Sequence, residues 1–284
     1  MEDHSVEFVC GGAAAFINVL VVFPLHKSIF IQQLHGVSWP DAVNLLKRDG
    51  LALLFRGVLP PLMQRSCSGA LMFGGQSFSE NLLHKNSTFS QLQKKTLSGV
   101  YAAFLESALT PFERVQTILQ TSQYNKVYQN TFRATLSLYN SHGIKELYRG
   151  FTPVLYRSCF GNALYFSGRQ VTKDVAPESL LYYERRVHDF VSGSLLGACV
   201  SAATFPMNVV KARIQSQIGV PYASVTRTII ALVSEEKGNI LRLYRGVPAN
   251  FLRSLISWGI ITMSYEWLLE HFGESSNEFP VPPP

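Results

Sequence analysis

Long apolar segments and short amphipathic ones alternate along the chain, and the same order occurs three times. The segments that we expect to form long apolar helices are 6–34, 60–83, 94–121, 153–173, 187–216 and 248–271. A short amphipathic helix is expected between the members of each pair, at 39–48, 128–141 and 223–236. Residues 8–25 and 190–210 carry no charge, and about 20 such residues cross a bilayer core as a helix. The pattern therefore predicts an all-α membrane protein with six membrane-spanning helices.

Polar markers recur in the same threefold order. The first long helix of each pair contains a proline, which is followed by an aromatic-Arg-Gly triplet and then by an Arg-Ser pair. The prolines are Pro24, Pro111 and Pro206, the triplets begin at Phe55, Tyr148 and Tyr244, and the pairs begin at Arg65, Arg157 and Arg253. Because every marker recurs after about 90 residues, one unit is used three times. We expect a single domain, 1–284, with repeats at about 6–86, 94–176 and 187–272 and a disordered tail at 273–284.

The composition supports a membrane location but leaves the partner open. The chain is 47% hydrophobic and only 15% charged, whereas soluble domains average about 25% charged residues. A large soluble helical bundle is the competing interpretation, but the longest uncharged runs exceed what such a core needs. The net charge of +6 suits an anionic solute and an anionic lipid surface equally well. An enzyme is not expected, because the sequence has no phosphate-binding loop, nucleophile–base set or metal motif.

The segments after the three prolines resemble the signature of the mitochondrial carrier family. That signature places an acid two residues and a base five residues after the proline, and then an acidic-Gly pair and an aromatic-basic-Gly triplet. Three degenerate copies cover about residues 6–271. The resemblance implies a six-helix, pseudo-threefold barrel in the inner mitochondrial membrane that alternates between cytoplasmic-open and matrix-open states. It also implies a monomer that contacts inner-membrane lipid such as cardiolipin and does not bind nucleic acid.

The charged gate positions of this signature are depleted here. In the family, they form salt bridges between repeats that close the matrix side. The corresponding residues are His26 and Ile29, Glu113 and Gln116, and Asn208 and Lys211. In the usual cyclic order Lys211 would face His26, and Gln116 could form a hydrogen bond with Asn208. Only Glu113 and Lys211 keep the expected charge, and we expect these two to pair because their repeats are neighbours in a ring of three.

The cytoplasmic gate of the family is equally reduced. Of its charges, the second repeat keeps Lys173 and the third keeps Glu266. Weak gates lower the barrier to interconversion, because fewer desolvated pairs must separate. Closure by hydrophobic contacts is the alternative, and the sequence is compatible with both.

Three arginines at corresponding depths indicate a site for an anion. The family's substrate contacts lie at this depth, which the resemblance carries onto Gln64 or Arg65, Arg157 with Ser158, and Arg253 with Ser254. The register in the first repeat stays open because of an additional proline at Pro61. Arginine offers a two-pronged donor for phosphate oxygens and stays protonated. The alternative is that these side chains reach a lipid headgroup or pair with acids.

Glu106 lies two helical turns before Glu113 on the same face of its helix. A carboxylate inside a membrane helix is a functional candidate by default. It could accept a ribose hydroxyl, neutralise a cationic ring, or pair with one of the arginines, and the sequence leaves these three roles open.

Three stretches, 111–116, 208–219 and 253–260, are similar to the animal mitochondrial NAD carriers. The similarity includes the atypical Gln116 and Asn208 and the intramembrane Glu106. It implies import of NAD+ from the cytosol into the matrix, with NAD+ as the transported substrate and no cofactor. Charge alone does not separate NAD+ from another nucleotide or phosphorylated cofactor. The depleted gates also leave open a non-transporting membrane adaptor.

Overall fold

The computed structural model describes residues 2–50, 53–65, 67–68, 71, 79, 90–175, 182–235 and 238–273, and within these it contains helices and turns only. The long helices and their parts are α1 (Glu2–His35), α4 (Gln91–Ser107), α5 (Thr110–Gln120), α8 (Phe151–Val175), α9 (Tyr182–Gln215) and α11 (Val247–Gly273). The short elements are α2 (Trp39–Asp49), η2 (Ser122–Tyr124), α6 (Thr131–His142), α7 (Ile144–Leu147), α10 (Val225–Glu235) and η3 (Ile240–Tyr244). Residues 59–65 are also helical, but most of the helix predicted at 60–83 lies outside the described residues, as does the tail from 274 onward.

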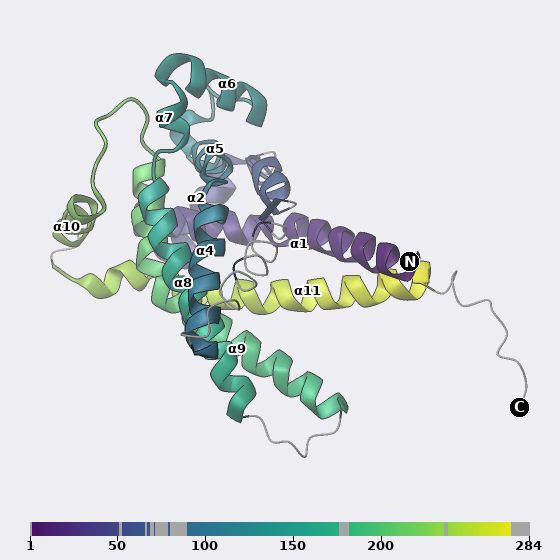
Figure 1. Ribbon diagram of the computed structural model, residues 1–284. Coiled ribbons are helices and arrows are strands. Elements are labelled where there is room, and N and C mark those ends of the chain that lie inside the picture. Colours follow the sequence, from purple (N-terminus) through teal and green to yellow (C-terminus); the bar gives the residue numbers. More distant parts are fainter. Residues whose placement is uncertain are drawn as a thin grey trace, which may run out of the picture.

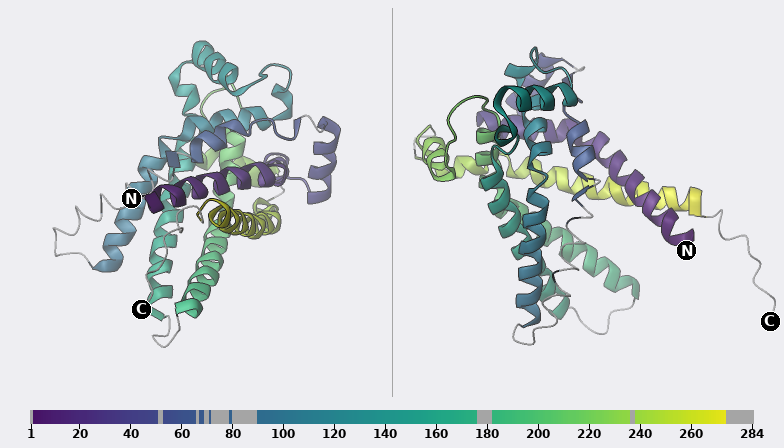
Figure 2. Two further views of the ribbon diagram at one scale, coloured as in Figure 1. Left: turned by 90° about the vertical axis from the view of Figure 1, so that its right-hand side faces the viewer. Right: turned by 45° about the horizontal axis from the view of Figure 1, so that its top comes forward.

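The helices follow the order that the hydrophobic pattern predicts. Two of the described helices are long and apolar enough to cross a membrane, at Gly12–His35 within α1 and Val191–Gln215 within α9. The first and last long helices, α1 and α11, lie side by side, and α8 lies between α4 and α9 (Figure 1). The α1–α11 pair runs at a steep angle to α4 and α8 (Figure 2). The last repeat therefore packs against both the first and the second.

The helix predicted at 94–121 is interrupted in the structure, and this part of the prediction is wrong. Helix α4 ends at Ser107 and α5 begins at Thr110, although α1 and α9 continue through their own prolines. Pro111 has no N–H to donate to the carbonyl of Ser107. The Thr110 hydroxyl donates to that carbonyl instead, at 2.6 Å. The proline therefore divides this helix in the second repeat, directly before the residues of the predicted gate.

An arginine of each aromatic-Arg-Gly triplet reaches into the next repeat. Arg56 donates to the backbone carbonyl and the side-chain oxygen of Asn125, at 2.8 and 2.7 Å. The other two contacts are Arg149 with the carbonyl of Val220 and Arg245 with that of Gly36. The loops that receive these arginines all follow the proline-containing helix of the next repeat. One sequence motif therefore joins first to second, second to third and third to first repeat.

Backbone conformation and close packing explain why glycine stands at the third position of the triplets. Gly57 and Gly150 have φ angles of 85° and 83°, in the region that glycine adopts most easily. A Cβ atom on Gly150 would also lie 2.6 Å from the side chain of Gln215 in the third repeat. Close approach between repeats therefore requires glycine at this position.

Candidate substrate site and gate

Glu113 on α5 is the point at which side chains of all three repeats meet. Its Oε1 accepts hydrogen bonds from Gln64 Nε2 and from Arg157 Nη2, each at 3.1 Å. Its Oε2 accepts from Lys211 Nζ, also at 3.1 Å. Gln64 belongs to the first repeat, Arg157 to the second and Lys211 to the third. We call these four residues the Glu113 node. The side chain of Glu113 is only 10% exposed.

The contact between Glu113 and Lys211 that the sequence predicts is present in the structure. The role of this pair as a gate stays a prediction. Lys211 therefore contacts Glu113 rather than His26. The predicted hydrogen bond between Gln116 and Asn208 is absent, although both residues are described.

The position opposite Glu113 in the family's cyclic order is apolar here. Ile29 is 3% exposed and packs in a cluster with Phe205 and Val209. It offers no cation to Glu113, so this carboxylate finds its positive partners on α8 and α9 instead. The positive partners of Glu113 therefore come from the second and third repeats.

Arg65 and Arg253 occupy equivalent positions in the first and third repeats, and neither forms an ion pair with a carboxylate among the described residues. Arg253 donates to Asn250 Oδ1 at 3.1 Å and to Ser254 Oγ at 3.4 Å, which satisfies polar atoms but does not neutralise the charge. Like charges at membrane depth are costly unless an anion neutralises them. We therefore treat the Arg65–Arg253 pair as the candidate anion subsite.

Glu106 is held by a residue that the sequence analysis did not identify. Ser68 Oγ donates to Glu106 Oε1 at 2.6 Å, and Ser68 lies one helical turn after Arg65. Glu106 forms no ion pair with a described arginine, although its charge acts on Arg65. The interpretation of Glu106 as a simple partner of an arginine is therefore not supported. The spacing of one helical turn between Arg65 and Ser68 could have indicated from the sequence that Ser68 lies on the same helix face.

The predicted contact residues thus divide between two places. Gln64 and Arg157 belong to the Glu113 node, whereas Arg65 and Arg253 lie outside it. Of the two candidates for the register in the first repeat, Gln64 donates to Glu113, whereas Arg65 is exposed. Ser158 receives a second, longer contact from Arg157 at 3.4 Å. The side chains of Lys173 and Glu266 lie outside what the structure describes.

A buried charge cluster between the second and third repeats was also missed. Glu146 accepts from Arg114 at 2.6 Å and from Arg149 at 3.2 Å, and the side chains of Arg114 and Glu146 are 0% and 3% exposed. Arg114 also donates to the carbonyl of Gln217 in the third repeat, at 2.7 Å. The Tyr222 hydroxyl donates to Glu146 at 3.4 Å. Partial desolvation of its hydroxyl and the neighbouring Glu146 carboxylate raise the pKa of Tyr222.

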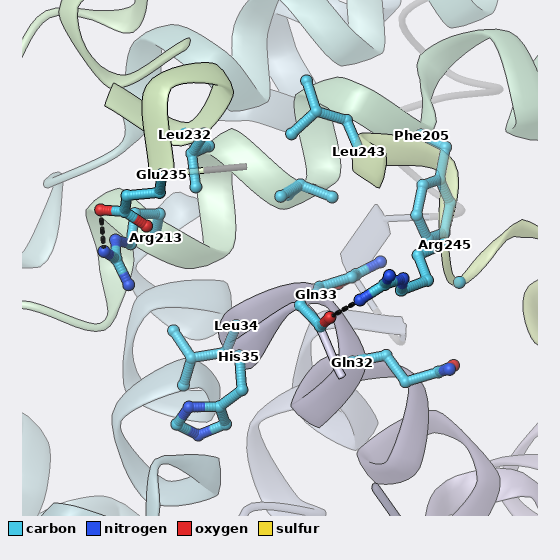
Figure 3. Close-up of a pocket in the computed structure, with 13 residues that line it drawn as sticks. Gln32, Gln33, Leu34, His35, Phe205, Arg213, Leu232, Glu235, Leu243 and Arg245 are labelled. Atoms are coloured by element: carbon cyan, nitrogen blue, oxygen red, sulfur yellow. Dashed lines mark hydrogen bonds and ion pairs between the residues drawn. The ribbon is translucent and has the colours of Figure 1, made fainter. Parts of the chain in front are cut away.

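A cavity of about 170 Å³ lies where the end of α1 meets α9, α10 and η3 (Figure 3). Its two arginines are already occupied. Arg213 pairs with Glu235 at 2.6 Å, and Arg245 donates to the carbonyl of Gly36. An anion entering this cavity would have to displace these contacts, whereas Arg65 and Arg253 form no ion pair in the described part of the chain. The cavity is therefore not our candidate substrate site.

Three similar helical units around shared interior charges are the organisation of a membrane solute carrier. The sequence profile of the family described as mitochondrial carrier protein matches residues 2–87, 89–179 and 184–276. The chain therefore belongs to the mitochondrial carrier family. Its members are multi-pass transporters of the inner mitochondrial membrane, and the chain is accordingly a transporter rather than an enzyme.

Relatives within the family narrow the comparison. The mitochondrial nicotinamide adenine dinucleotide transporter of Mus musculus is 44% identical over 264 residues, which cover 93% of this chain and 88% of the relative. The transporter of the same name from Homo sapiens is 42% identical over 263 residues, with the same coverage. Solute carrier family 25 member 53 of Homo sapiens is 33% identical over 278 residues, covering 93% and 87%. The family and the all-α fold with three repeats, as predicted from the sequence, are confirmed.

Proposed function

We propose that the chain imports NAD+ from the cytosol into the mitochondrial matrix by alternating access. The relatives named as nicotinamide adenine dinucleotide transporters support this substrate. The structural observation that carries the proposal is the Arg65–Arg253 pair. The pyrophosphate of NAD+ has two negative charges, and two guanidinium groups without carboxylate partners complement them.

The remaining site residues extend this arrangement. The neighbouring hydroxyl of Ser158 is a further donor for phosphate oxygens, whereas that of Ser254 already donates to the Asn250 carbonyl. Arg157 is the third cation. Glu106 supplies the opposite charge, which suits a ribose hydroxyl or the cationic nicotinamide ring. The proposed site therefore matches a substrate that is anionic in its centre and carries a hydroxyl or a cation at one end.

Uptake of labelled NAD+ by the purified protein in liposomes tests the proposal. Unlabelled NAD+, ADP, coenzyme A and thiamine pyrophosphate serve as competitors. We expect NAD+ to compete best. Stronger competition by another compound would assign the site to that nucleotide or cofactor, whereas no uptake of any of them would favour the non-transporting adaptor. Binding of inner-membrane lipid and the monomeric state remain predictions.

Replacing Ser68 with alanine is expected to raise the KM for NAD+ by roughly tenfold, because a hydrogen bond to a charged group contributes about 1.5 kcal/mol or more. Ser68→Thr keeps the hydroxyl and should restore most of the affinity. Inhibition of uptake by inorganic pyrophosphate should not change in Ser68→Ala, since pyrophosphate has neither ribose nor nicotinamide.

The matched control for Ser68 is Ser167→Ala. Ser167 shares a hydrogen bond of 2.7 Å with Thr96 between α8 and α4, so this variant also removes one interhelical bond. Its KM should stay near that of the parent chain. An equal rise of KM in both serine variants would show that Ser68 acts on helix packing only.

The Glu113–Lys211 pair should behave as a coupled unit. Glu113→Ala and Lys211→Ala are each expected to lower NAD+ uptake strongly. Glu113→Ala leaves Lys211 without its carboxylate, and Lys211→Ala removes one of the two cations that neutralise the poorly hydrated Glu113. The double variant should recover part of the loss. Uptake rates of the four proteins give the coupling energy, and strictly additive losses would show that the two residues act separately. The same cycle at the more exposed pair Arg213–Glu235 is the control, with little effect expected.

A further inference from the structure

The three equivalent arginines are not equivalent in their surroundings. Arg157 donates to Glu113 at 3.1 Å, whereas Arg65 and Arg253 have no carboxylate partner among the described residues. Arg157 also keeps a buried Nε without a hydrogen-bond partner, and its side chain is 27% exposed. It is therefore held by a carboxylate on one side and remains partly accessible. A phosphate that binds Arg157 must compete with Glu113 for it.

The transfer of Arg157 from Glu113 to a phosphate has a low free-energy cost in this structure, because Glu113 has other partners. Glu113 is shared by two cations, Arg157 and Lys211, and by the amide of Gln64. If a phosphate takes Arg157, Glu113 still keeps Lys211 and Gln64. No buried carboxylate is left unpaired, which would be the costly outcome.

The partners of Glu113 come from different repeats, so a movement between repeats would change which of them remain. Arg157 and Glu113 both belong to the second repeat, on α8 and α5, whereas Lys211 lies on α9 of the third repeat. If the second and third repeats separate, Lys211 moves away from Glu113, whereas Arg157 belongs to the same repeat as Glu113. Arg157 then becomes the remaining cation for Glu113, and the competition against a bound phosphate becomes stronger.

We propose that Glu113 is an internal competitor for Arg157 that weakens substrate binding when Lys211 moves away, and so promotes release of the substrate on the side where the node opens. The proposal rests on the proposed function in one respect, namely that the substrate carries a phosphate bound by Arg157. Binding and opening are then linked, because whatever strengthens the hold of Glu113 on Arg157 lowers the affinity for substrate.

This competition predicts opposite effects of two neutralising substitutions at one ion pair. Glu113→Gln removes the competitor, so the full-length purified protein should bind NAD+ roughly fivefold more tightly while transporting it more slowly. Lys211→Gln leaves Arg157 as the main cation of Glu113, so it should bind NAD+ roughly fivefold more weakly. These factors correspond to about 1 kcal/mol for a partly exposed ion pair. A purely structural role would move both affinities in the same direction.

The experiment measures the Kd for NAD+ and, separately, for inorganic pyrophosphate by calorimetry in detergent. Glu235→Gln, at the more exposed Arg213–Glu235 pair, is the control and should leave both Kd values unchanged. Glu113→Asp withdraws the carboxylate from Arg157 and should give an intermediate Kd, which provides a second test if Glu113→Gln does not fold. Equal or weaker binding by the folded Glu113 variants, or shifts of the same sign in Glu113→Gln and Lys211→Gln, would overturn the competition.

The Kd values for pyrophosphate test the competition at Arg157 independently of the assignment of NAD+ as the substrate. If the parent chain binds pyrophosphate but not NAD+, the assignment of NAD+ fails, while opposite shifts of the pyrophosphate Kd still support the competition. If NAD+ binds as proposed and the two variants shift together, the assignment of NAD+ stands and the competition is wrong.

Discussion

Replacing Arg253 with alanine is expected to lower NAD+ uptake by roughly tenfold to a hundredfold. The variant removes charge-assisted hydrogen bonds to phosphate, which contribute about 1.5–3 kcal/mol each. Folding should be little affected, because the contacts of Arg253 within the described structure are with Asn250 and Ser254. Arg253→Lys keeps the charge but loses the two-pronged donor, so it should restore uptake only in part. Initial rates of uptake into liposomes measure the effect.

The same substitution at Arg157 should also lower uptake strongly, but it additionally removes a cation from Glu113. Arg133→Ala is the matched control, since this exposed arginine on α6 donates to Gln129 at the surface. Near-normal uptake by both Arg157→Ala and Arg253→Ala would exclude these arginines as phosphate ligands. A loss in Arg133→Ala of similar size would point to a general effect of positive charge.

Glu146→Gln is expected to destabilise the protein by roughly 3–5 kcal/mol, because it leaves two buried arginines, Arg114 and Arg149, without their carboxylate. The unfolding temperature in detergent should fall by several degrees. Glu235→Gln removes a carboxylate from an ion pair of the same 2.6 Å length, but Glu235 is 53% exposed. The control should therefore lose about 1 kcal/mol or less. Equal unfolding temperatures for the two variants would contradict the assignment of Glu146 as the buried link between repeats.

The three repeats and the depth of the three arginines are readable in the amino-acid order. Charge-free runs of about 20 residues and recurring motifs are properties of the chain itself, and they require no knowledge of contacts. For the same reason the helix order was predicted correctly. The interruption at Pro111 was not, since Pro24 and Pro206 lie inside continuous helices and local sequence alone does not separate the three cases.

The buried cluster at Glu146 had no threefold pattern to reveal it. Arg114 lies three residues after its proline, where the other repeats have Lys27 and Val209. Lys27 donates to the carbonyl of Leu53 in its own repeat. The carboxylate of Glu146 occurs in only one repeat, and such a charge resembles any solvated surface charge until its burial is known. Burial is a property of the packed molecule.

The sequence by itself determined the class of this protein, its threefold plan and the cations that line its interior, because these follow from composition, period and motif. Only the tertiary structure decided which partners those cations have. Arg157 is held by Glu113, while Arg253 remains without a carboxylate in the described residues, although both belong to the same repeated motif. The difference arises because ion pairing depends on distances of a few ångströms between segments far apart in the chain, and the repeat period carries no information about those distances.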